Sequence, residues 1–226
     1  MYERHKPLVL DDVDLADPAA NEVEVELVAS GVCHSDLHHL ERETPIKPPV
    51  VLGHEGAGVV KTVGANVTRA KPGDHVIIAV GPQCGECFYC VRGMPYFCTP
   101  AQPPRTHLSK DGQPIVQFAQ AATYAERTVV NQNNIVKIRE DAPLDIFCIV
   151  GCAVATGVDA VTHTAEVEPG SNVVVVGTDG VGLNVIQGAR LAGAERVIAV
   201  DLLDNKLEVA HEMGAGEVAR AVVEIQ

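Results

Sequence analysis

The stretch SNVVVVGTDGVGLNVIQGARLAGAERVIAVD (171–201) decides the fold of the second half of this chain. It opens with a continuous apolar run, SNVVVVG, which is typical of a strand buried inside a parallel sheet. A helical period follows in VGLNVIQGARLAG (181–193), and ERVIAVD (195–201) is a second apolar run. Helical periodicity returns in NKLEVAHEMG (205–214). This β-α-β-α order predicts the beginning of a doubly wound parallel sheet.

The loop after the first strand has the glycine spacing of a dinucleotide-binding fingerprint, with one departure. The fingerprint reads G-x-G-x-x-G, and the six residues here are Gly177-Thr178-Asp179-Gly180-Val181-Gly182. Asp179 stands where a second glycine would let the backbone approach a pyrophosphate closely. Its carboxylate would face an anion bound at the helix N-terminus. We therefore expect Asp179 to weaken pyrophosphate binding.

Asp201 ends the second predicted strand. A carboxylate at this place in a β-α-β unit hydrogen-bonds the adenosine ribose diol and disfavours a 2′-phosphate. Taken alone, an aspartate at a strand end is more often an ordinary surface residue. Inside this unit it favours NAD over NADP.

The first half of the chain, from about residue 7 to 150, shows a different pattern. Short β-type runs alternate with turns that contain glycine or proline. The runs are EVEVELVAS (22–30), GVVKTVGAN (58–66), HVIIAV (75–80), TYAERTVV (123–130) and NIVKI (134–138). Many short strands at this spacing predict a β-barrel-like domain.

A cysteine-rich segment, GPQCGECFYCVRGMPYFC (81–98), interrupts this β pattern. It has no apolar period, so we expect a loop or lobe that brings together Cys84, Cys87, Cys90 and Cys98. Four thiolates at such spacing can reach one tetrahedral Zn²⁺ at about 2.3 Å and leave no position open for water. This is the pattern of a structural zinc site. The alternatives are two disulfides or four free thiols, but MYERHKPLVL (1–10) lacks the apolar core of a secretory signal, so disulfides fit poorly.

Three further cysteines, Cys33, Cys148 and Cys152, lie far from this segment, and His54 and Glu55 lie between them. Two thiolates and one imidazole can hold a catalytic zinc whose fourth position takes water or substrate. Spacing alone does not show which of these residues converge. A lone buried cysteine usually acts as a small hydrophobe, and we interpret Cys148 in this way.

Composition excludes some classes of protein. The 226 residues carry a formal net charge of −13, no tryptophan and 4% aromatic residues. An acidic surface without aromatic platforms argues against a nucleic-acid-binding zinc ribbon. There is no run of about 18 apolar residues that would span a bilayer. We expect a cytoplasmic protein with neither nucleic acid nor a membrane as its partner.

Four segments, taken in order, resemble the zinc-dependent alcohol dehydrogenases of the medium-chain dehydrogenase/reductase superfamily. They are GVCHSDLH (31–38), the stretch from Gly53-His54-Glu55 to Gly64, the cysteine lobe, and GCAVATG (151–157) with the dinucleotide-binding unit behind it. The resemblance implies a β-rich GroES-like catalytic domain over 1–150, with a structural zinc lobe at 81–99. It also implies an α/β Rossmann domain, a doubly wound parallel sheet, over 151–226.

The resemblance assigns two Zn²⁺ ions per chain. The lobe cysteines would hold the structural ion, and Cys33, His54 and Cys152 would hold the catalytic one. Asp36 resembles the carboxylate that orients the zinc-bound imidazole, and Glu55, next to that ligand, would likewise support the ligands without binding the zinc itself.

The resemblance also assigns the proton path and the cofactor contacts. Ser35 would take the proton of the alcohol and pass it towards His38. The implied NAD-binding residues are His34, Thr156, Gly177, Gly180, Gly182, Asp201 and Lys206. Among them, His34 would contact the pyrophosphate, Thr156 the nicotinamide, and Lys206 the adenosine ribose.

The implied function is hydride transfer between an alcohol, or the corresponding aldehyde or ketone, and NAD. The residues after Asp201 can supply one more strand at best, so we expect the Rossmann domain to be incomplete and the chain to be truncated. The alternative function is therefore a zinc-binding fragment without turnover. A zinc-independent quinone-reductase-like relative fits poorly, because such relatives lack the lobe and the ligand triad. The loop 99–118 would border the substrate channel, and the full-length form would be a homo-oligomer.

Overall fold

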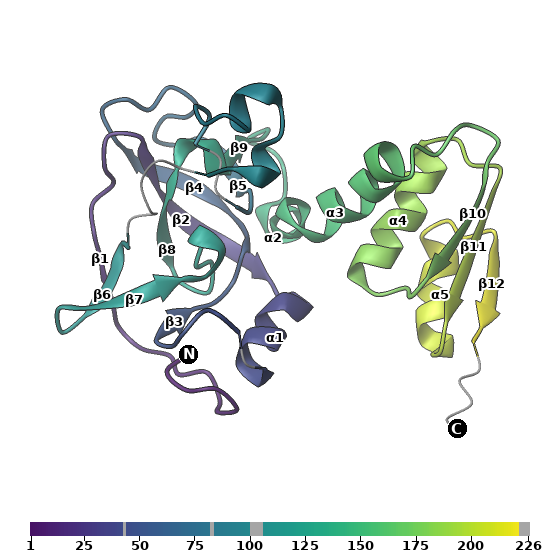
Figure 1. Cartoon of the computed structure of the whole chain (residues 1–226), viewed down its shortest axis with the longest axis horizontal. Coiled ribbons are helices and arrows are strands. Elements are labelled where there is room, and N and C mark those ends of the chain that lie inside the picture. Colours follow the sequence, from purple (N-terminus) through teal and green to yellow (C-terminus); the bar gives the residue numbers. More distant parts are fainter. Residues whose placement is uncertain (43, 82–83, 100–105, 222–226) are drawn as a thin grey trace. The chain divides into compact units, whose positions relative to one another are not determined.

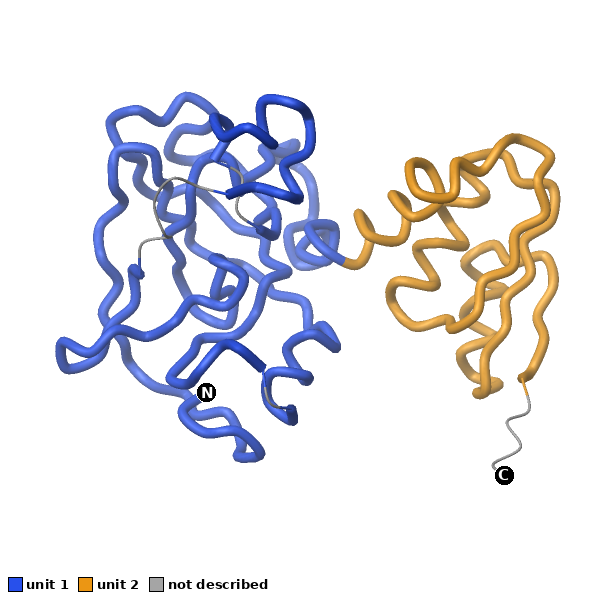
Figure 2. The backbone as a smooth tube through the Cα atoms, viewed as in Figure 1, with its two compact units in different colours: residues 1–152 blue, residues 153–226 orange. Residues whose placement is uncertain are grey.

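The computed structural model of the protein describes residues 1–42, 44–81, 84–99 and 106–221. It divides into two compact units, Met1–Cys152 and Ala153–Gln226, which are coloured separately in Figure 2. Across the described ranges no single helix is long and apolar enough to cross a membrane, and only the consecutive pair Leu144–Gly151 and Ala153–Thr164 reaches that length and composition when counted together.

The main sheet of the first unit is antiparallel, with strand order β8-β2-β4-β5-β9 in the described part of the chain. Its strands are β2 (Glu22–Gly31), β4 (Glu55–Val63), β5 (His75–Ile78), β8 (Arg127–Asn131) and β9 (Ile135–Lys137). The five predicted runs thus form one sheet (Figure 1). Alternation in EVEVELVASG buries Val23 and Val25 completely, against Val60, Val76 and Ile78.

A second sheet of the first unit was not predicted. Its order is β1-β6-β7-β3, and its strands are β1 (Asp14–Leu15), β3 (Val50–Val51), β6 (Leu108–Lys110) and β7 (Gln113–Gln117). Two of these strands, β1 and β3, have only two residues each and are too short to show a period of two. Of the predicted loop 99–118, residues 100–105 lie outside the described residues, while the rest includes β6 and β7.

Short helices connect the strands of the first unit. They are α1 (His34–Glu41), η1 (Cys90–Arg92), η2 (Pro95–Phe97), η3 (Phe118–Gln120), η4 (Gln132–Asn134), α2 (Leu144–Phe147) and η5 (Cys148–Gly151). The described part of the cysteine lobe therefore contains two short 3₁₀ turns, η1 and η2, and otherwise has the irregular backbone that the sequence predicts.

The second unit has the predicted β-α-β-α order. Its parallel strands are β10 (Asn172–Val176), β11 (Arg196–Asp201) and β12 (Glu217–Arg220), with β11 in the middle of the described sheet. Its helices are α3 (Ala153–Asp159), the π-helical turn η6 (Ala160–Thr164), α4 (Gly180–Leu191) and α5 (Asp204–Glu212). The core between them is aliphatic and includes Val175, Ile186, Ala189 and Val197. β12 is the one further strand that the sequence allowed.

Candidate metal centres and phosphate loop

Asp36 organises the first candidate metal centre. It lies in the first turn of α1 and is only 4% exposed. Its carboxylate accepts hydrogen bonds from the backbone N–H of Cys33 at 3.3 Å and of Gly53 at 2.8 Å. The same carboxylate lies 3.3 Å from Nδ1 of His54. One buried side chain thus fixes two segments that are far apart in sequence, and it orients the imidazole so that the other ring nitrogen is available as a ligand.

Cys33 is the N-cap residue of α1, and its thiol accepts from the backbone N–H of Asp36 in a capping box. Burial raises the pKa of this thiol, but the N–H and hydroxyl of Ser35 and the imidazole of His54 lower it more, so the net shift is downward. A thiol at a helix N-terminus, next to hydrogen-bond donors, readily becomes a thiolate ligand.

His54 is held by the glycine before it. Gly53 has φ +88°, and a Cβ there would lie 2.4 Å from Cδ1 of Tyr124 and 2.6 Å from its backbone nitrogen. Only glycine combines this left-handed backbone with so close an approach. The imidazole of His54 is 3% exposed and packs edge-on against Phe118, with 5.3 Å between the ring centroids.

Cys152 reaches the centre because η5 packs tightly on β5. A Cβ on Gly151 would lie 2.1 Å from the carbonyl oxygen of Ile78. The absence of a side chain at Gly151 therefore lets the end of η5 approach the strand and sets the position of the next residue, Cys152. Cys148, at the start of η5, is buried and donates to the carbonyl of Asp145 at 3.4 Å. It lies outside both candidate ligand groups, as interpreted from the sequence.

The structure brings Cys33, His54, Glu55 and Cys152 together, with all their ligand atoms within 4.8 Å of one another. Three of them are the expected ligands. Glu55, which was expected only beside a ligand, is 3% exposed and places its carboxylate among the ligand atoms. Because Glu55 follows His54 in the sequence, its location near the centre could be predicted. The direction of its side chain could not, because that depends on how β4 begins at Glu55.

The electrostatics of this cluster favour a cation. Burial lowers the pKa of His54, yet Asp36 and Cys152 more than compensate and raise it to about 10. The carboxylate of Asp36 and the thiol of Cys152 cause this upward shift, so the place that they surround favours a positive charge. Two half-buried thiols with a buried imidazole and a buried carboxylate match the donors that zinc prefers. The residues present therefore fit a metal ion with three or four protein ligands.

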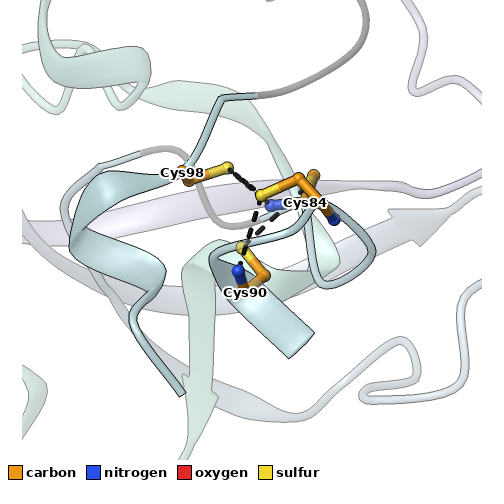
Figure 3. Close-up of side chains that lie close together, drawn as sticks. Cys84, Cys90 and Cys98 are labelled. Carbon is orange, nitrogen blue, oxygen red and sulfur yellow. Dashed lines mark hydrogen bonds between the residues drawn. The ribbon is translucent and has the colours of Figure 1, made fainter. Parts of the chain in front are cut away.

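The second candidate centre is the cysteine lobe. The ligand sulfurs of Cys84, Cys87, Cys90 and Cys98 lie within 4.8 Å of one another. Sγ of Cys84 lies 3.9 Å from that of Cys90, and Sγ of Cys87 lies 3.9 Å from that of Cys98. Figure 3 shows the labelled side chains of Cys84, Cys90 and Cys98 converging. Tetrahedral Zn–S bonds of about 2.3 Å require sulfurs about 3.8 Å apart. All seven cysteines of the chain are free, so the disulfide alternative is not what the structure forms.

Backbone N–H groups of the lobe donate hydrogen bonds to the cysteine sulfurs, which stabilises the thiolate form. The N–H of Cys84 donates to Sγ of Cys98 at 3.4 Å, and that of Cys87 to Sγ of Cys84 at 3.3 Å. Backbone N–H groups of Cys90 and Thr99 lower the pKa of Cys87 to about 6. Burial and the neighbouring thiols raise that of Cys98 to about 12. Four thiolates cannot coexist here without a cation, and a bound zinc would supply that charge.

The predicted proton path lies on α1. Ser35 is exposed next to the Cys33 thiol. His38 lies one helical turn from His34, with 4.6 Å between the ring centroids. Burial, followed by the charges of Arg42 and His34, lowers the pKa of His38. A neutral imidazole at neutral pH is able to accept a proton.

The predicted cofactor residues of the second unit lie at the carboxyl ends of β10 and β11, except Thr156, which is exposed on α3. Gly182 lies in the first turn of α4, where a Cβ would lie 1.9 Å from the carbonyl oxygen of Gly177. The loop after β10 thus packs closely against the first turn of α4, as the glycine spacing predicts. The carboxylate of Asp179, expected to face a bound phosphate, instead pairs with Nζ of Lys206 at 2.5 Å.

Sequence reasoning missed two side chains at the first metal centre. Phe118 packs on His54, and the hydroxyl of Tyr124 is buried without a hydrogen-bond partner in the described part of the chain. Burial and the nearby carboxylate of Asp36 raise the pKa of Tyr124. Both residues belong to the segment between β7 and β8, and nothing in their spacing links them to Cys33 or His54.

Substituting Gly53 by Ala should disrupt the first centre more than the fold. The added Cβ would meet the ring and backbone of Tyr124, and the left-handed φ would be strained, at a cost of about 1–3 kcal/mol. We expect loss of the metal at this centre, with the lobe metal retained. Gly73→Ala is the matched control, because Gly73 has φ +91° and open space around it. Zinc content measured for both variants should fall only for Gly53→Ala, and an equal loss in both would contradict this account.

Comparison with known proteins gives a consistent result. The family model "Alcohol dehydrogenase GroES-like domain" matches residues 19–140, and the model "Zinc-binding dehydrogenase" matches residues 180–224. Among curated proteins, the alcohol dehydrogenase class-3 of Pisum sativum is 40% identical over 96% of this chain and 60% of its own length. The S-(hydroxymethyl)glutathione dehydrogenase of Paracoccus denitrificans is 44% identical over 94% of this chain and 60% of its own length.

Solved structures that resemble this chain also include alcohol dehydrogenases. A zinc-binding-domain alcohol dehydrogenase protein from Burkholderia ambifaria superposes with a TM-score of 0.91 at 33% identity, covering 97% of this chain and 62% of its own. The benzyl alcohol dehydrogenase of Acinetobacter calcoaceticus gives a TM-score of 0.83 at 34% identity, covering 92% and 59%. The chain thus spans about three fifths of the length of the relatives it matches.

Proposed function

We propose that this chain, which belongs to the alcohol dehydrogenase GroES-like domain family, is part of a zinc-dependent oxidoreductase. That enzyme would transfer a hydride between an alcohol and NAD. The observation that carries the proposal is the cluster of Cys33, His54, Glu55 and Cys152 in the same unit as a separate four-cysteine lobe. A closed site of four thiolates serves structure, whereas two thiolates and one imidazole leave a fourth position that a carboxylate or a substrate can take.

In this proposal Cys33, His54 and Cys152 hold the catalytic zinc, and Asp36 keeps the imidazole in its orientation. Glu55 is close enough to act as a fourth ligand when no substrate is present. When bound, zinc supplies Lewis-acid chemistry that makes an alcohol easier to deprotonate. The exposed hydroxyl of Ser35 receives that proton and passes it towards His38, whose lowered pKa keeps it able to accept a proton at neutral pH.

The second unit binds the cofactor at the carboxyl ends of β10 and β11. The adenosine half of the cofactor would be bound by the glycines of the loop together with Asp201 and Lys206. The resemblance assigns His34 to the pyrophosphate and Thr156 to the nicotinamide. The carboxylate of Asp201 favours NAD over NADP, because a 2′-phosphate would meet a negative charge.

Small alcohols and their aldehydes are the proposed substrates. The names of the relatives suggest two types to test first, an aryl alcohol and the adduct of formaldehyde with glutathione. We place the full-length protein in the cytoplasm as a homo-oligomer, a proposal supported by family membership and by seven unpaired cysteines.

Removal of zinc tests the proposed function. The full-length protein should reduce NAD⁺ in the presence of a primary or aryl alcohol, with NADP⁺ as the poorer cofactor. Treatment with a zinc chelator should lower the rate on the order of a hundredfold or more, and added Zn²⁺ should restore it. Turnover that survives complete metal removal would contradict the proposal. Zinc binding without any turnover by the 226-residue chain itself would support the fragment alternative for that chain.

A further inference from the structure

Two side chains proposed to bind the adenosine ribose are already engaged by the phosphate loop. Lys206 in α5 pairs with Asp179, and Asp201 at the end of β11 is bonded to Thr178. Thr178 and Asp179 are adjacent residues between Gly177 and Gly180. A two-residue segment of the loop therefore contacts both ribose-binding candidates at once.

The contact of Asp179 is unusual for its position. Asp179 is the N-cap residue of α4, with φ −73° and ψ −173°, yet its side chain makes no capping hydrogen bond. An aspartate at this position normally accepts from the N–H groups of the first turn. Here it turns outward, 79% exposed, and reaches Nζ of Lys206 at 2.5 Å. The first-turn N–H groups of α4 are thus free of this carboxylate, while the ammonium of Lys206 is occupied by it.

The contact of Thr178 fills the acceptor capacity of Asp201. One carboxylate oxygen of Asp201 accepts from the backbone N–H of Thr178 at 2.8 Å and from its hydroxyl at 3.0 Å. The other oxygen accepts from the N–H groups of Leu202 at 2.7 Å and Leu203 at 3.1 Å. A carboxylate has about four lone-pair positions, so a ribose hydroxyl must compete with one of these donors. The Thr178 hydroxyl is the one side-chain donor among them.

We propose that the dipeptide Thr178-Asp179 is a built-in competitor for the adenosine half of the cofactor, holding Lys206 and Asp201 until the dinucleotide displaces it. The proposal rests on the proposed function. Binding the dinucleotide would open a surface ion pair and one hydrogen bond from a hydroxyl to a carboxylate, and would also bring phosphates near the Asp179 carboxylate. The ion pair is weak, and a ribose hydroxyl that replaces the Thr178 hydroxyl as the donor to Asp201 keeps the net cost of that exchange small. Each contact therefore has an effect on the order of fivefold on the binding equilibrium, and the charge repulsion adds to them.

ADP-ribose tests the effect of charge, because it carries the pyrophosphate without the nicotinamide. In the zinc-loaded full-length protein, Asp179→Asn should raise ADP-ribose affinity by about tenfold at low salt and by less at high salt, where charges are screened. Asp179→Gly should give a similar rise, since the charge is the main obstacle. A rise with Gly but none with Asn would overturn the proposal, because the obstacle would then be the Cβ.

Adenosine tests the competition without phosphate charge. Lys206→Met should change adenosine affinity less than about twofold in the parent, where Asp179 occupies the ammonium. In the Asp179→Asn background, where Lys206 is free, the same substitution should lower affinity by about three- to fivefold. Thr178→Val should raise adenosine affinity by about two- to fivefold, while Thr178→Ser, which keeps the hydroxyl, is the matched control and should leave it unchanged.

The outcomes separate this proposal from the proposed function. If the parent binds ADP-ribose and all variants bind with the parent's affinities, the competitor does not exist and the proposed function stands. An equal effect of Lys206→Met in both backgrounds would also overturn the competition. If neither ADP-ribose nor NADH binds to any folded variant, the proposed function falls, and this proposal falls with it.

Discussion

Replacing Cys152 by Ser should abolish alcohol oxidation by the full-length protein while leaving its fold largely intact. Cys152 is one of three expected ligands of the first centre, and it lies at the end of η5, outside the main sheet. Loss of a thiolate ligand removes the metal or misplaces it, and Lewis-acid stabilisation of several kcal/mol is lost with it. We expect the rate to fall on the order of a thousandfold or more, measured as NADH formation at saturating alcohol.

Cys148→Ala is the matched control for this experiment. Cys148 lies in the same short helix, is buried, and belongs to neither ligand group of the described residues. Its loss should lower stability by about 1 kcal/mol and leave the rate per folded molecule near that of the parent. Comparable loss of activity in Cys148→Ala and Cys152→Ser would show that disturbance of η5, rather than loss of a ligand, explains the result.

Replacing Cys90 by Ser should have the opposite effect, a large loss of stability with a small loss of activity. Among the described residues of the lobe around η1 and η2, the large apolar side chains form no buried core, since Val91, Tyr96 and Phe97 are all more than half exposed. Four thiolates on one ion are therefore what holds the lobe together, and metal binding contributes directly to folding. We expect a fall in melting temperature on the order of 10 °C, with activity per folded molecule reduced much less than in Cys152→Ser.

The comparison of the two variants is the decisive part of this prediction. If Cys90→Ser and Cys152→Ser lose melting temperature and activity in the same proportion, the division into a structural and a catalytic metal is wrong. Differential scanning calorimetry and initial rates on the same preparations give both quantities.

The sequence predicted most of the secondary structure that frames the site. The five β-type runs of the first half became one sheet, because alternation in EVEVELVASG and its neighbours reports directly which face is buried. The β-α-β-α order of the second unit was also predicted, because its strands are continuous apolar runs. The second sheet was missed, because strands such as Asp14–Leu15 and Val50–Val51 form through tertiary contacts and are too short to carry a pattern.

The two metal centres differ in how far the sequence could reach. The lobe cysteines are close in sequence, so their convergence follows from spacing. Cys33, His54 and Cys152 come from three distant segments, and only resemblance to a family linked them. The outward turn of Asp179 to Lys206 could not be predicted, because it depends on a side-chain rotamer and on the placement of α5 beside the loop.

The metal content of three proteins tests the central claim most directly, namely that this chain builds two separate zinc sites. Elemental analysis should be performed on the parent, Cys152→Ser and Cys90→Ser after extensive dialysis. The account predicts two zinc ions per chain in the parent and one in each variant, with Cys152→Ser keeping the lobe ion and Cys90→Ser keeping the ion at Cys33, His54 and Cys152. One zinc ion or none in the reduced parent, or loss of both ions from Cys152→Ser, would contradict it.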